Sequence, residues 1–374
     1  MKKIQMVDLQ SQYYKIKNEV DNAILNVLDS ASFINGPEVK MFQKEMEEYL
    51  DVKHVIPCAN GTDALQIALM ALGLEEGDEV ITADFTFAAT VEVIHLLKLK
   101  SVLVDVDYNT FTIDPEKIKA AITPKTKAII PVHIFGQCAN MDEILKIAKE
   151  HNLYVVEDNA QAIGAEYTFA DGTVKKSGTM GTIGTTSFFP SKNLGCYGDG
   201  GAIFTNDDAI AHRLRGIVNH GMYERYYHDE VGVNSRLDSV QAAVLRKKLP
   251  NLDGYNDARR KAADYYDEAF QGHTNILTPQ RFDQSTHVFH QYTLRILNGK
   301  RNELQQYLSS KDIPAMIYYP VALRNQKAYY QESKAEDFVN TDQLLDQVIS
   351  LPMHTELDEE QLKYICDSVL EFMK

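Results

Sequence analysis

The sequence has 374 residues, of which 44% are hydrophobic and 24% are charged, as in a globular chain with one large and one smaller domain. A core of this size needs no disulfide or metal to hold it together. The formal net charge of −15 and the lack of a basic run argue against a nucleic-acid-binding protein, and no apolar stretch approaches the ~18 residues of a membrane span.

The N-terminus and the cysteines indicate a cytoplasmic protein. The first residues, MKKIQMVDLQ, lack the apolar core of a signal peptide. Four cysteines lie far apart and never form a CxxC pair, which argues against a zinc site and against a disulfide framework. The histidines lie in unrelated segments without ligand spacing, so we predict no metal site.

From about residue 52 the chain alternates short β-rich runs with amphipathic helices. Strands are predicted at residues 54–57, 79–82, 101–105, 128–133 and 153–157. Helices are predicted at residues 62–72, 90–97 and 141–151, with another opened by Asp114 and Pro115. The strands are apolar on both faces, as in a parallel sheet covered by helices. The pattern therefore predicts a doubly wound α/β domain.

The pattern changes near residue 235. Residues 235–271 read as helix broken or kinked at Pro250, and strands are predicted at 288–297 and 315–319. Helices around 342–349 and 359–373 close the chain. We expect a large domain at 1–245, with an N-terminal arm or helix at 1–35, and a small C-terminal α+β domain at 246–374.

The first candidate site segment lies between a predicted strand and helix at residues 59–63. Gly61 allows a tight turn, and Thr62 with the free amides of the first helical turn could hold a phosphate. By itself, the segment fits a plain helix cap by Thr62 equally well.

The second candidate is Asp158, which follows a buried strand. A carboxylate at this place can hold a protonated pyridine nitrogen of a cofactor and keep its ring an electron sink. The more common role of such an aspartate is to cap the next helix, and strand ends that bind nucleotides or metals look similar.

The third and most informative segment spans residues 186–201. Lys192 follows an apolar strand, with Ser187 before it and four glycines behind it. Burial lowers the pKa of a lysine amine and makes it nucleophilic, and an aldehyde cofactor needs such an amine for its resting imine. The glycines fit neither a P-loop nor a dinucleotide fingerprint. Together with the other two segments, Lys192 is predicted to form an imine rather than to be a solvated surface lysine.

Five motifs in this order are similar to a known family: GTDAL (61–65), TFAAT (86–90), EDNAQAIGA (157–165), SFFPSKNLGCYGDGGAI (187–203) and GVNSRLD (232–238). The chain resembles the DegT/DnrJ/EryC1/StrS aminotransferases over essentially its whole length. The resemblance implies a pyridoxal-phosphate transferase of fold type I (aspartate aminotransferase-like), α/β, with a mostly parallel central sheet and a small C-terminal α+β domain.

The resemblance also implies roles for individual residues. Lys192 forms the imine with pyridoxal phosphate and then acts as the general acid and base, and Asp158 pairs with the pyridinium nitrogen. Gln161 bonds the 3-oxygen of the cofactor, and Phe87 stacks on its ring. The phosphate contacts are Gly61, Thr62, Asp63 and Ser187, joined by Asn234 of the partner subunit. Because each site then takes residues from two chains, the resemblance implies an obligatory homodimer.

Within the family, the sequence resembles the 3-keto sugar aminotransferases, including those that act on UDP-linked 3-keto-N-acetylglucosaminuronic acid. The implied substrate contacts are Phe33, Ser191, Arg236, Tyr318, Tyr319 and Arg324. Arg236 is equally compatible with a salt bridge to Asp238 or a partner-chain acid, and the two tyrosines with packing of a short strand. Ala322 and Arg324 depart from the usual family pattern: Ala322 loosens the turn, and Arg324 adds a cation near the expected substrate mouth.

The expected reaction moves an amino group from L-glutamate to a nucleotide-linked keto sugar, through pyridoxamine phosphate, for surface polysaccharide or glycan precursors. A 4-keto sugar aminotransferase and a non-catalytic sugar-sensing homologue are the alternatives. A dehydratase of the same fold is disfavoured by Lys192, which such enzymes usually replace with histidine. An NAD-dependent dehydrogenase is disfavoured because no GxGxxG follows the first strand.

Overall fold

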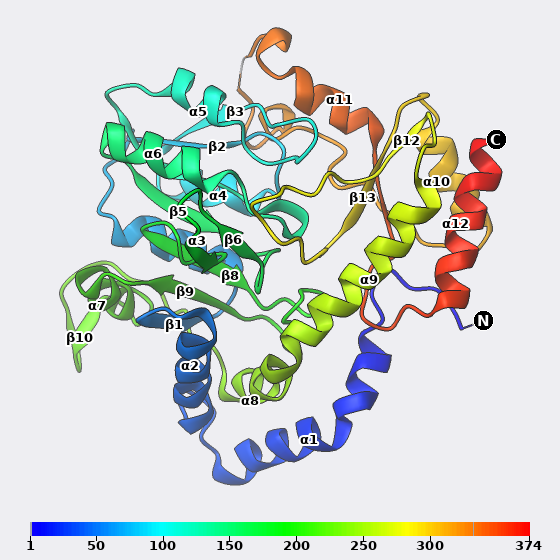
Figure 1. The fold of residues 1–374 in the computed structure, drawn as a ribbon. Coiled ribbons are helices and arrows are strands. Elements are labelled where there is room, and N and C mark those ends of the chain that lie inside the picture. Colours follow the sequence, from blue (N-terminus) through cyan, green and yellow to red (C-terminus); the bar gives the residue numbers. More distant parts are fainter. Residues whose placement is uncertain (1, 332) are drawn as a thin grey trace.

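The computed structural model describes residues 2–331 and 333–374, and its centre is a seven-stranded sheet of order β1-β9-β8-β5-β4-β2-β3 (Figure 1). The strands are β1 (His54–Cys58), β2 (Glu79–Ala83), β3 (Lys100–Val104), β4 (Thr126–Ile130), β5 (Tyr154–Asp158), β8 (Ile183–Ser187) and β9 (Gly201–Thr205). Strand β9 pairs antiparallel with both β1 and β8, and the remaining pairs are parallel. The predicted mostly parallel sheet is therefore confirmed.

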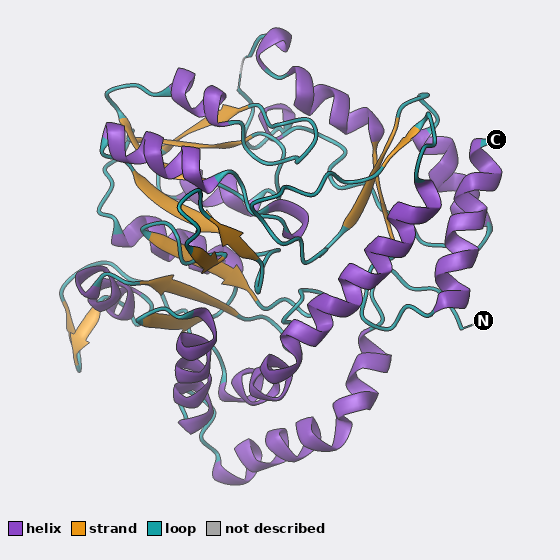
Figure 2. Ribbon diagram, in the orientation of Figure 1, coloured by secondary structure: helices purple, strands orange, loops and turns teal. Residues whose placement is uncertain are grey.

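Helices cover both faces of this sheet (Figure 2). Apolar side chains of α3 (Gly61–Ala71), α4 (Ala89–Leu96) and α7 (Asp208–Ile217) form the core on one face. Those of α5 (Pro115–Ala121) and α6 (Met141–His151) contribute to the core on the other face. Successive side chains of a strand point to opposite faces. Thus Val155 and Val156 of β5 belong to different cores, and the same alternation separates Glu157 from Asp158.

The N-terminal segment forms two helices, α1 (Leu9–Ser30) and α2 (Pro37–Leu50), which pack with α8 (Ser239–Lys248). Arg246 of α8 forms ion pairs with two glutamates of α2. The predicted break at Pro250 is confirmed, because a 3-10 turn, η2 (Leu249–Asn251), separates α8 from α9 (Leu252–Phe270).

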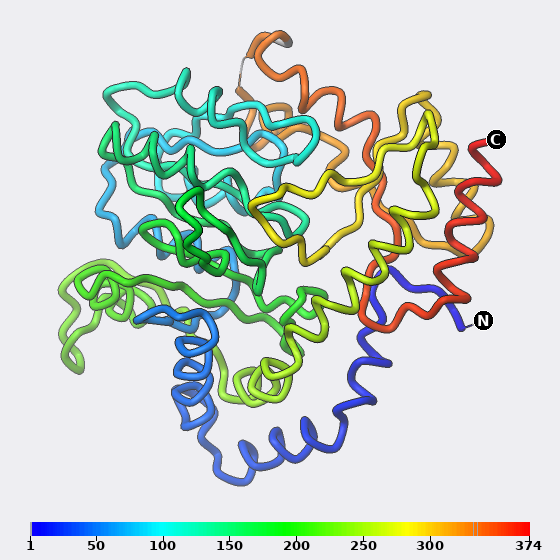
Figure 3. The backbone as a smooth tube through the Cα atoms, viewed as in Figure 1, coloured from blue at the N-terminus to red at the C-terminus, as the bar shows by residue number. Residues whose placement is uncertain are grey.

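A three-stranded antiparallel sheet forms the C-terminal unit, with β12 (Ile276–Leu277), β13 (Tyr292–Ile296) and β14 (Val348–Leu351). It shares an apolar core with α9, α10 (Arg301–Ser310) and α12 (Glu359–Met373). Ile4 belongs to this core, so the N-terminal residues lie beside the last helix (Figure 3).

One predicted element in this unit is wrong, and the end of a second differs from the prediction. Residues 315–319 do not form a strand, and only an isolated bridge joins Met316 to Ser350. The helix expected at 342–349 is α11 (Val339–Gln347), which ends before Val348 because the following apolar run pairs with β13 as β14. That pairing joins segments far apart in the sequence, which local periodicity does not reveal.

The remaining elements are short. They are β6 (Glu166–Thr168), β7 (Val174–Lys176), β10 (Met222–Glu224), β11 (Tyr227–His228), η1 (Ile134–Gly136), η3 (Leu323–Asn325) and η4 (Ala335–Asp337). Among the helices of the described residues, none is both long and apolar enough to cross a bilayer.

Candidate active site

The first part of the site is the turn between β1 and α3. Helix α3 begins at Gly61, and its cap is Asn60, whose side chain accepts a hydrogen bond of 2.8 Å from the Asp63 amide. The alternative in which Thr62 caps the helix is therefore wrong. Thr62 instead lies in the first turn, where the leading amides of a helix have no intrahelical acceptor and favour an anion.

The ends of β8 and β9 close this turn so tightly that only glycine fits. A Cβ atom on Gly61 would lie 2.7 Å from Cβ of Ser187, and one on Gly201 would lie 2.4 Å from the carbonyl oxygen of Asn60. Both distances are well inside van der Waals contact. The structure thus brings Gly61, Thr62 and Ser187 together into a small cradle of amides and hydroxyls that suits a phosphate.

Asp158, the last residue of β5, is 5% exposed. Its Oδ2 accepts a 2.8 Å hydrogen bond from the Thr90 hydroxyl, and its Oδ1 accepts a 3.2 Å bond from the Ala160 amide. A hydrogen-bonded turn follows it rather than a helix, so the alternative of a helix cap is wrong. A buried carboxylate with only two protein donors retains acceptor capacity for a third N–H group.

Lys192 lies in the loop between β8 and β9. The ends of this loop are closed by a 2.7 Å bond from the Phe188 amide to the Gly200 carbonyl, and Lys192 itself donates its amide to Phe189 at 2.8 Å. Burial lowers the pKa of the Lys192 amine to about 8, although the nearby charge of Asp158 acts in the opposite direction. About a tenth of the amine is therefore uncharged and nucleophilic at pH 7, and about half at pH 8.

Sequence reasoning did not identify Asn193 as the anchor of this loop. Its side-chain nitrogen donates to the Asn256 side chain at 2.8 Å and to the Val288 carbonyl at 2.9 Å. Both bonds reach outside the sheet, toward α9 and the segment that precedes β13. The only sequence signal was its place next to Lys192.

Gln161 lies between the sheet and a tyrosine of the C-terminal unit. Its Oε1 accepts a 2.6 Å bond from the Phe135 amide, and its Nε2 donates to the Tyr319 hydroxyl at 3.2 Å. The Tyr319 ring lies 6.4 Å from that of Phe87, centroid to centroid, and burial raises the pKa of Tyr319, as the charge of Asp158 does to a lesser extent. These contacts bring Gln161, Tyr319, Phe87 and Asp158 into one region.

The other predicted residues lie at the edge of this region or away from it. Ser191 is partly exposed beside Lys192, and the Tyr318 ring lies 6.1 Å from that of Tyr319. Phe33 is 46% exposed and Asn234 is also exposed. Across residues 2–331 and 333–374, no ion pair joins Arg236 to an acid, so its expected salt bridge with Asp238 does not form within the chain.

Arg324 does not lie free at the substrate mouth. Its side chain is 5% exposed, and its guanidinium forms ion pairs with Asp84 and Asp342. Its backbone amide also donates to Asp84 at 2.8 Å, and the guanidinium lies 4.4 Å from the Phe338 ring centroid. The charge of Arg324 is thus paired with acids inside the protein. The local sequence around Arg324 does not indicate these acids.

These features fit one kind of cofactor. A nucleophilic lysine, a buried carboxylate and a phosphate cradle together match the aldehyde, the ring nitrogen and the phosphate of pyridoxal phosphate. Because Gly61 and Gly201 have no Cβ atom, the ends of β8 and β9 can lie directly against the first turn of α3, whose free amides suit a phosphate.

Comparisons with known proteins point the same way. Residues 14–370 match a family model described as the DegT/DnrJ/EryC1/StrS aminotransferase family. The chain is 46% identical over 363 residues to UDP-2-acetamido-2-deoxy-3-oxo-D-glucuronate aminotransferase of Pseudomonas aeruginosa, covering 97% of this chain and 98% of that one. It is 45% identical over 377 residues to a Geobacillus stearothermophilus protein named pleiotropic regulatory protein, covering 99% of each.

A solved structure with a bound cofactor is also similar. The crystal structure of ntda from Bacillus subtilis with bound cofactor pmp superposes with a TM-score of 0.91 at 29% sequence identity, covering 100% of this chain and 86% of that chain.

Proposed function

Because the chain belongs to the DegT/DnrJ/EryC1/StrS aminotransferase family of pyridoxal-phosphate enzymes, we propose that it moves an amino group from L-glutamate to a nucleotide-linked keto sugar. The observation that carries the proposal is the arrangement of Lys192 and Asp158 beside the cradle at Gly61 and Ser187. The 3-keto sugars are favoured because the relative that is 46% identical is named for a 3-oxo-glucuronate substrate.

The chain's own residues divide the chemistry between them. Bound pyridoxal phosphate supplies an aldehyde carbon and a ring that accepts electrons. Lys192 would hold the cofactor through its uncharged amine, and when free it would take up and return a proton at Nζ. Asp158 holds the ring nitrogen in its protonated form. These two are the catalytic residues of the proposal.

The remaining cofactor contacts position the ring. Gly61, Thr62, Asp63 and Ser187 hold the phosphate with amides and hydroxyls, on the basis of the cradle described above. Gln161 holds the 3-oxygen, a role supported by its place between Phe135 and Tyr319. Phe87 covers one face of the ring. Its side chain is 58% exposed in the chain alone and is thus open to a ligand.

The substrate side is assigned to Phe33, Ser191, Arg236, Tyr318 and Tyr319. Arg236 carries the most specific part of this assignment. A guanidinium without an acidic partner in the described chain is suited to a bidentate bond with a carboxylate or a pyrophosphate.

Two further parts of the proposal concern the cell and the assembly. Asn234 is exposed in the single chain, which supports a role in the site of a partner subunit and hence a homodimer. The reaction is placed in the cytoplasm, which is supported by the four free and buried cysteines.

A regulatory role is the second candidate, and the relative named pleiotropic regulatory protein favours it. In that case the chain would bind cofactor and sugar without turnover. The full set of Lys192, Asp158 and Gln161 supports catalysis instead, because binding without turnover does not need a proton-carrying lysine together with a carboxylate that keeps the cofactor ring an electron acceptor.

A panel of substrates tests the proposal. The protein loaded with pyridoxal phosphate is given L-glutamate and UDP-, dTDP- or GDP-linked keto sugars with the ketone at C3 or C4, and products are identified by mass. We expect amination of a UDP-linked 3-keto sugar, and none with Lys192→Ala as the control. A cofactor spectrum without amination of any sugar would contradict catalysis and support the regulatory role. Amination of 4-keto sugars alone would overturn the C3 assignment.

A further inference from the structure

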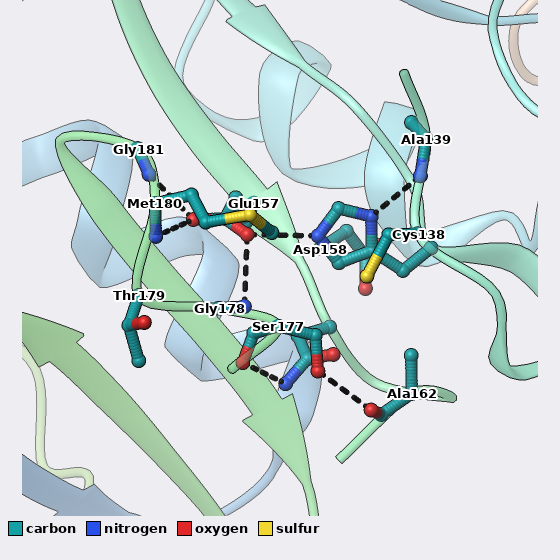
Figure 4. Close-up of polar contacts among 12 residues, drawn as sticks. Cys138, Ala139, Glu157, Asp158, Ala162, Ser177, Gly178, Thr179, Met180 and Gly181 are labelled. Carbon is teal, nitrogen blue, oxygen red and sulfur yellow. Dashed lines mark hydrogen bonds and ion pairs between the residues drawn. The ribbon is translucent and has the colours of Figure 1, made fainter. Parts of the chain in front are cut away.

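Glu157 stands next to Asp158 but points to the opposite face of the sheet, into the core. Its side chain is fully buried, and among the described residues its four hydrogen-bond partners are all N–H groups (Figure 4). Oε2 accepts from Nε2 of His133 and from the Gly178 amide, both at 2.8 Å. Oε1 accepts from the amides of Met180 at 2.6 Å and Gly181 at 2.5 Å. A carboxylate is the only side-chain group that can accept four such bonds.

The first partner, His133, connects Glu157 to the backbone of Asp158. The Ala139 amide donates to Nδ1 of His133 at 3.2 Å, so this nitrogen carries no hydrogen and Nε2 is the donor to Glu157. The backbone amide of His133 donates to the Asp158 carbonyl at 3.0 Å, and the Asp158 amide donates to Pro131 at 3.0 Å. His133, three residues after β4, is therefore joined to the last two residues of β5, through its imidazole to Glu157 and through its backbone amide to Asp158.

The other partners of Glu157 lie in the loop 177–181. This loop is hydrogen-bonded to the earlier turn that contains Gln161. The Ser177 hydroxyl donates to the Ala162 carbonyl at 2.6 Å, and the Asn159 side chain donates to the Ser177 carbonyl at 3.0 Å. Asn159 and Ala162 flank Gln161 in the sequence. Glu157 therefore fixes the loop 177–181, and this loop fixes the turn that contains Gln161, the proposed contact to the 3-oxygen of the cofactor.

We propose that Glu157 is a positioning residue for the cofactor site, which acts through His133 and the loop 177–181 to set the directions of Asp158 and Gln161. The inference rests on the proposed function, since it assigns those two residues to the cofactor. Removing the carboxylate leaves buried N–H donors without acceptors. In Glu157→Gln, an NH2 group replaces one of the two accepting oxygens. Whichever way the side chain is turned, this NH2 group faces two of the N–H donors and cannot accept their bonds.

Two hydroxyls of the same loop separate positioning from simple support of the fold. Ser177 donates to Ala162 and so reaches the turn of Gln161. Thr179 donates at 2.7 Å to the Lys176 carbonyl and so remains within its own loop. Ser177→Ala and Thr179→Ala each delete one hydroxyl-to-carbonyl bond, but only the first deletion breaks the connection to the cofactor site.

The experiment uses full-length protein and reads cofactor binding rather than turnover. Wild type, Glu157→Gln, Ser177→Ala and Thr179→Ala are stripped of cofactor and titrated with pyridoxal phosphate, and the visible spectrum of the bound cofactor is recorded with each melting temperature. We expect Ser177→Ala to raise Kd roughly three- to tenfold and to shift the spectrum. Thr179→Ala should keep the wild-type Kd and spectrum. Glu157→Gln should exceed the effect of Ser177→Ala.

Equal Kd and spectra for the two loop variants would overturn the inference, as would a folded Glu157→Gln protein that binds like wild type. If Glu157→Gln does not fold, the Ser177 and Thr179 pair decides the question. Failure of wild type to bind pyridoxal phosphate covalently would instead overturn the proposed function, because Lys192 would then not be the attachment site.

Discussion

At the scale of single residues, the surroundings of Lys192 favour the neutral amine over the charged ammonium group. The folded chain lowers the pKa of this amine from its ordinary 10.5 to about 8 by burial. Between these two values the unfolded chain binds more protons than the folded one, so stability rises with pH in this range. Below pH 8 the full cost of burying the ammonium group is present. The reactive amine is thus obtained at the expense of folding stability.

Lys192→Met should therefore stabilise the cofactor-free protein. We expect a gain of about 2 kcal/mol in the free energy of unfolding at pH 7, allowing for the partial exposure of the side chain. This gain in the free energy of unfolding should shrink as pH rises from 8 toward 10.5, because Lys192 is then uncharged in folded wild type and the cost of burying its ammonium group disappears. Urea unfolding at several pH values measures this. Lys363→Met, on the surface of α12, is the control and should show no such pH dependence. A gain that is constant with pH would show that packing, not the charge, is responsible.

At the scale of elements, the C-terminal segment is attached to the large sheet by two buried aspartates. Asp84, after β2, holds Arg324. Asp105, after β3, accepts bonds from the amide and the hydroxyl of Thr341 at 2.8 and 2.7 Å. These contacts fix the segment that follows Tyr318 and Tyr319 against the strand ends, and thereby bring both tyrosines to the site.

Arg324→Met tests this attachment. It should lower the free energy of unfolding by about 3–5 kcal/mol, because Asp84 then remains buried without its partner. Adding Asp84→Asn should recover part of the loss by removing the unpaired charge. Denaturant unfolding of the two single variants and the double variant gives the coupling. Lys98→Met, which loses an exposed pair with Glu76, is the control and should change little. A substrate KM that rises without loss of stability would instead return Arg324 to a role at the substrate mouth.

Features that depend on neighbouring residues could be predicted from the sequence, and features that depend on distant residues could not. Helix α6 spans the predicted residues 141–151 because its apolar period and its Asn140 cap are both local. The segments of Gly61, Asp158 and Lys192 were found for the same reason, since each is a short run at a strand end. Thr90 was not foreseen as the hydroxyl partner of Asp158, because that bond spans 68 residues of sequence. The strand β14 was missed because its partner β13 lies beyond an intervening helix and loop.

At the scale of the whole molecule, three of the predicted site residues are exposed in the single chain. Phe87, Phe33 and Asn234 are all exposed in the single chain, although two of them are large apolar residues. Exposed apolar side chains around a functional site are typical of an interface. The proposed homodimer accounts for Phe33 and Asn234, and the proposed cofactor accounts for Phe87.

Mixing two inactive variants tests whether sites are shared. Lys192→Ala and Asn234→Ala should each be inactive as homodimers, if Asn234 serves the site of the partner. In a refolded equal mixture, one site of each heterodimer is intact, so about a quarter of wild-type activity should return. Size-exclusion chromatography confirms the dimer, and Lys192→Ala mixed with itself is the control. No recovery from a mixture shown to contain heterodimers would place both residues in the same subunit's site.

The position of β9 also bears on how the protein is made. Strand β1 lies at the edge of the large sheet, and β9 is the neighbour with which it pairs, residue by residue from His54 with Thr205 to Cys58 with Gly201. During translation, β1 emerges from the ribosome long before β9 exists. The turn at 59–63 therefore lacks its contacts with the ends of β8 and β9 until these two strands and the Lys192 loop between them have been synthesised and have folded. A nascent chain shorter than residue 205 thus exposes a strand edge that a chaperone or a second nascent chain can occupy, and the turn at 59–63 is among the last parts of the seven-stranded sheet region to assemble.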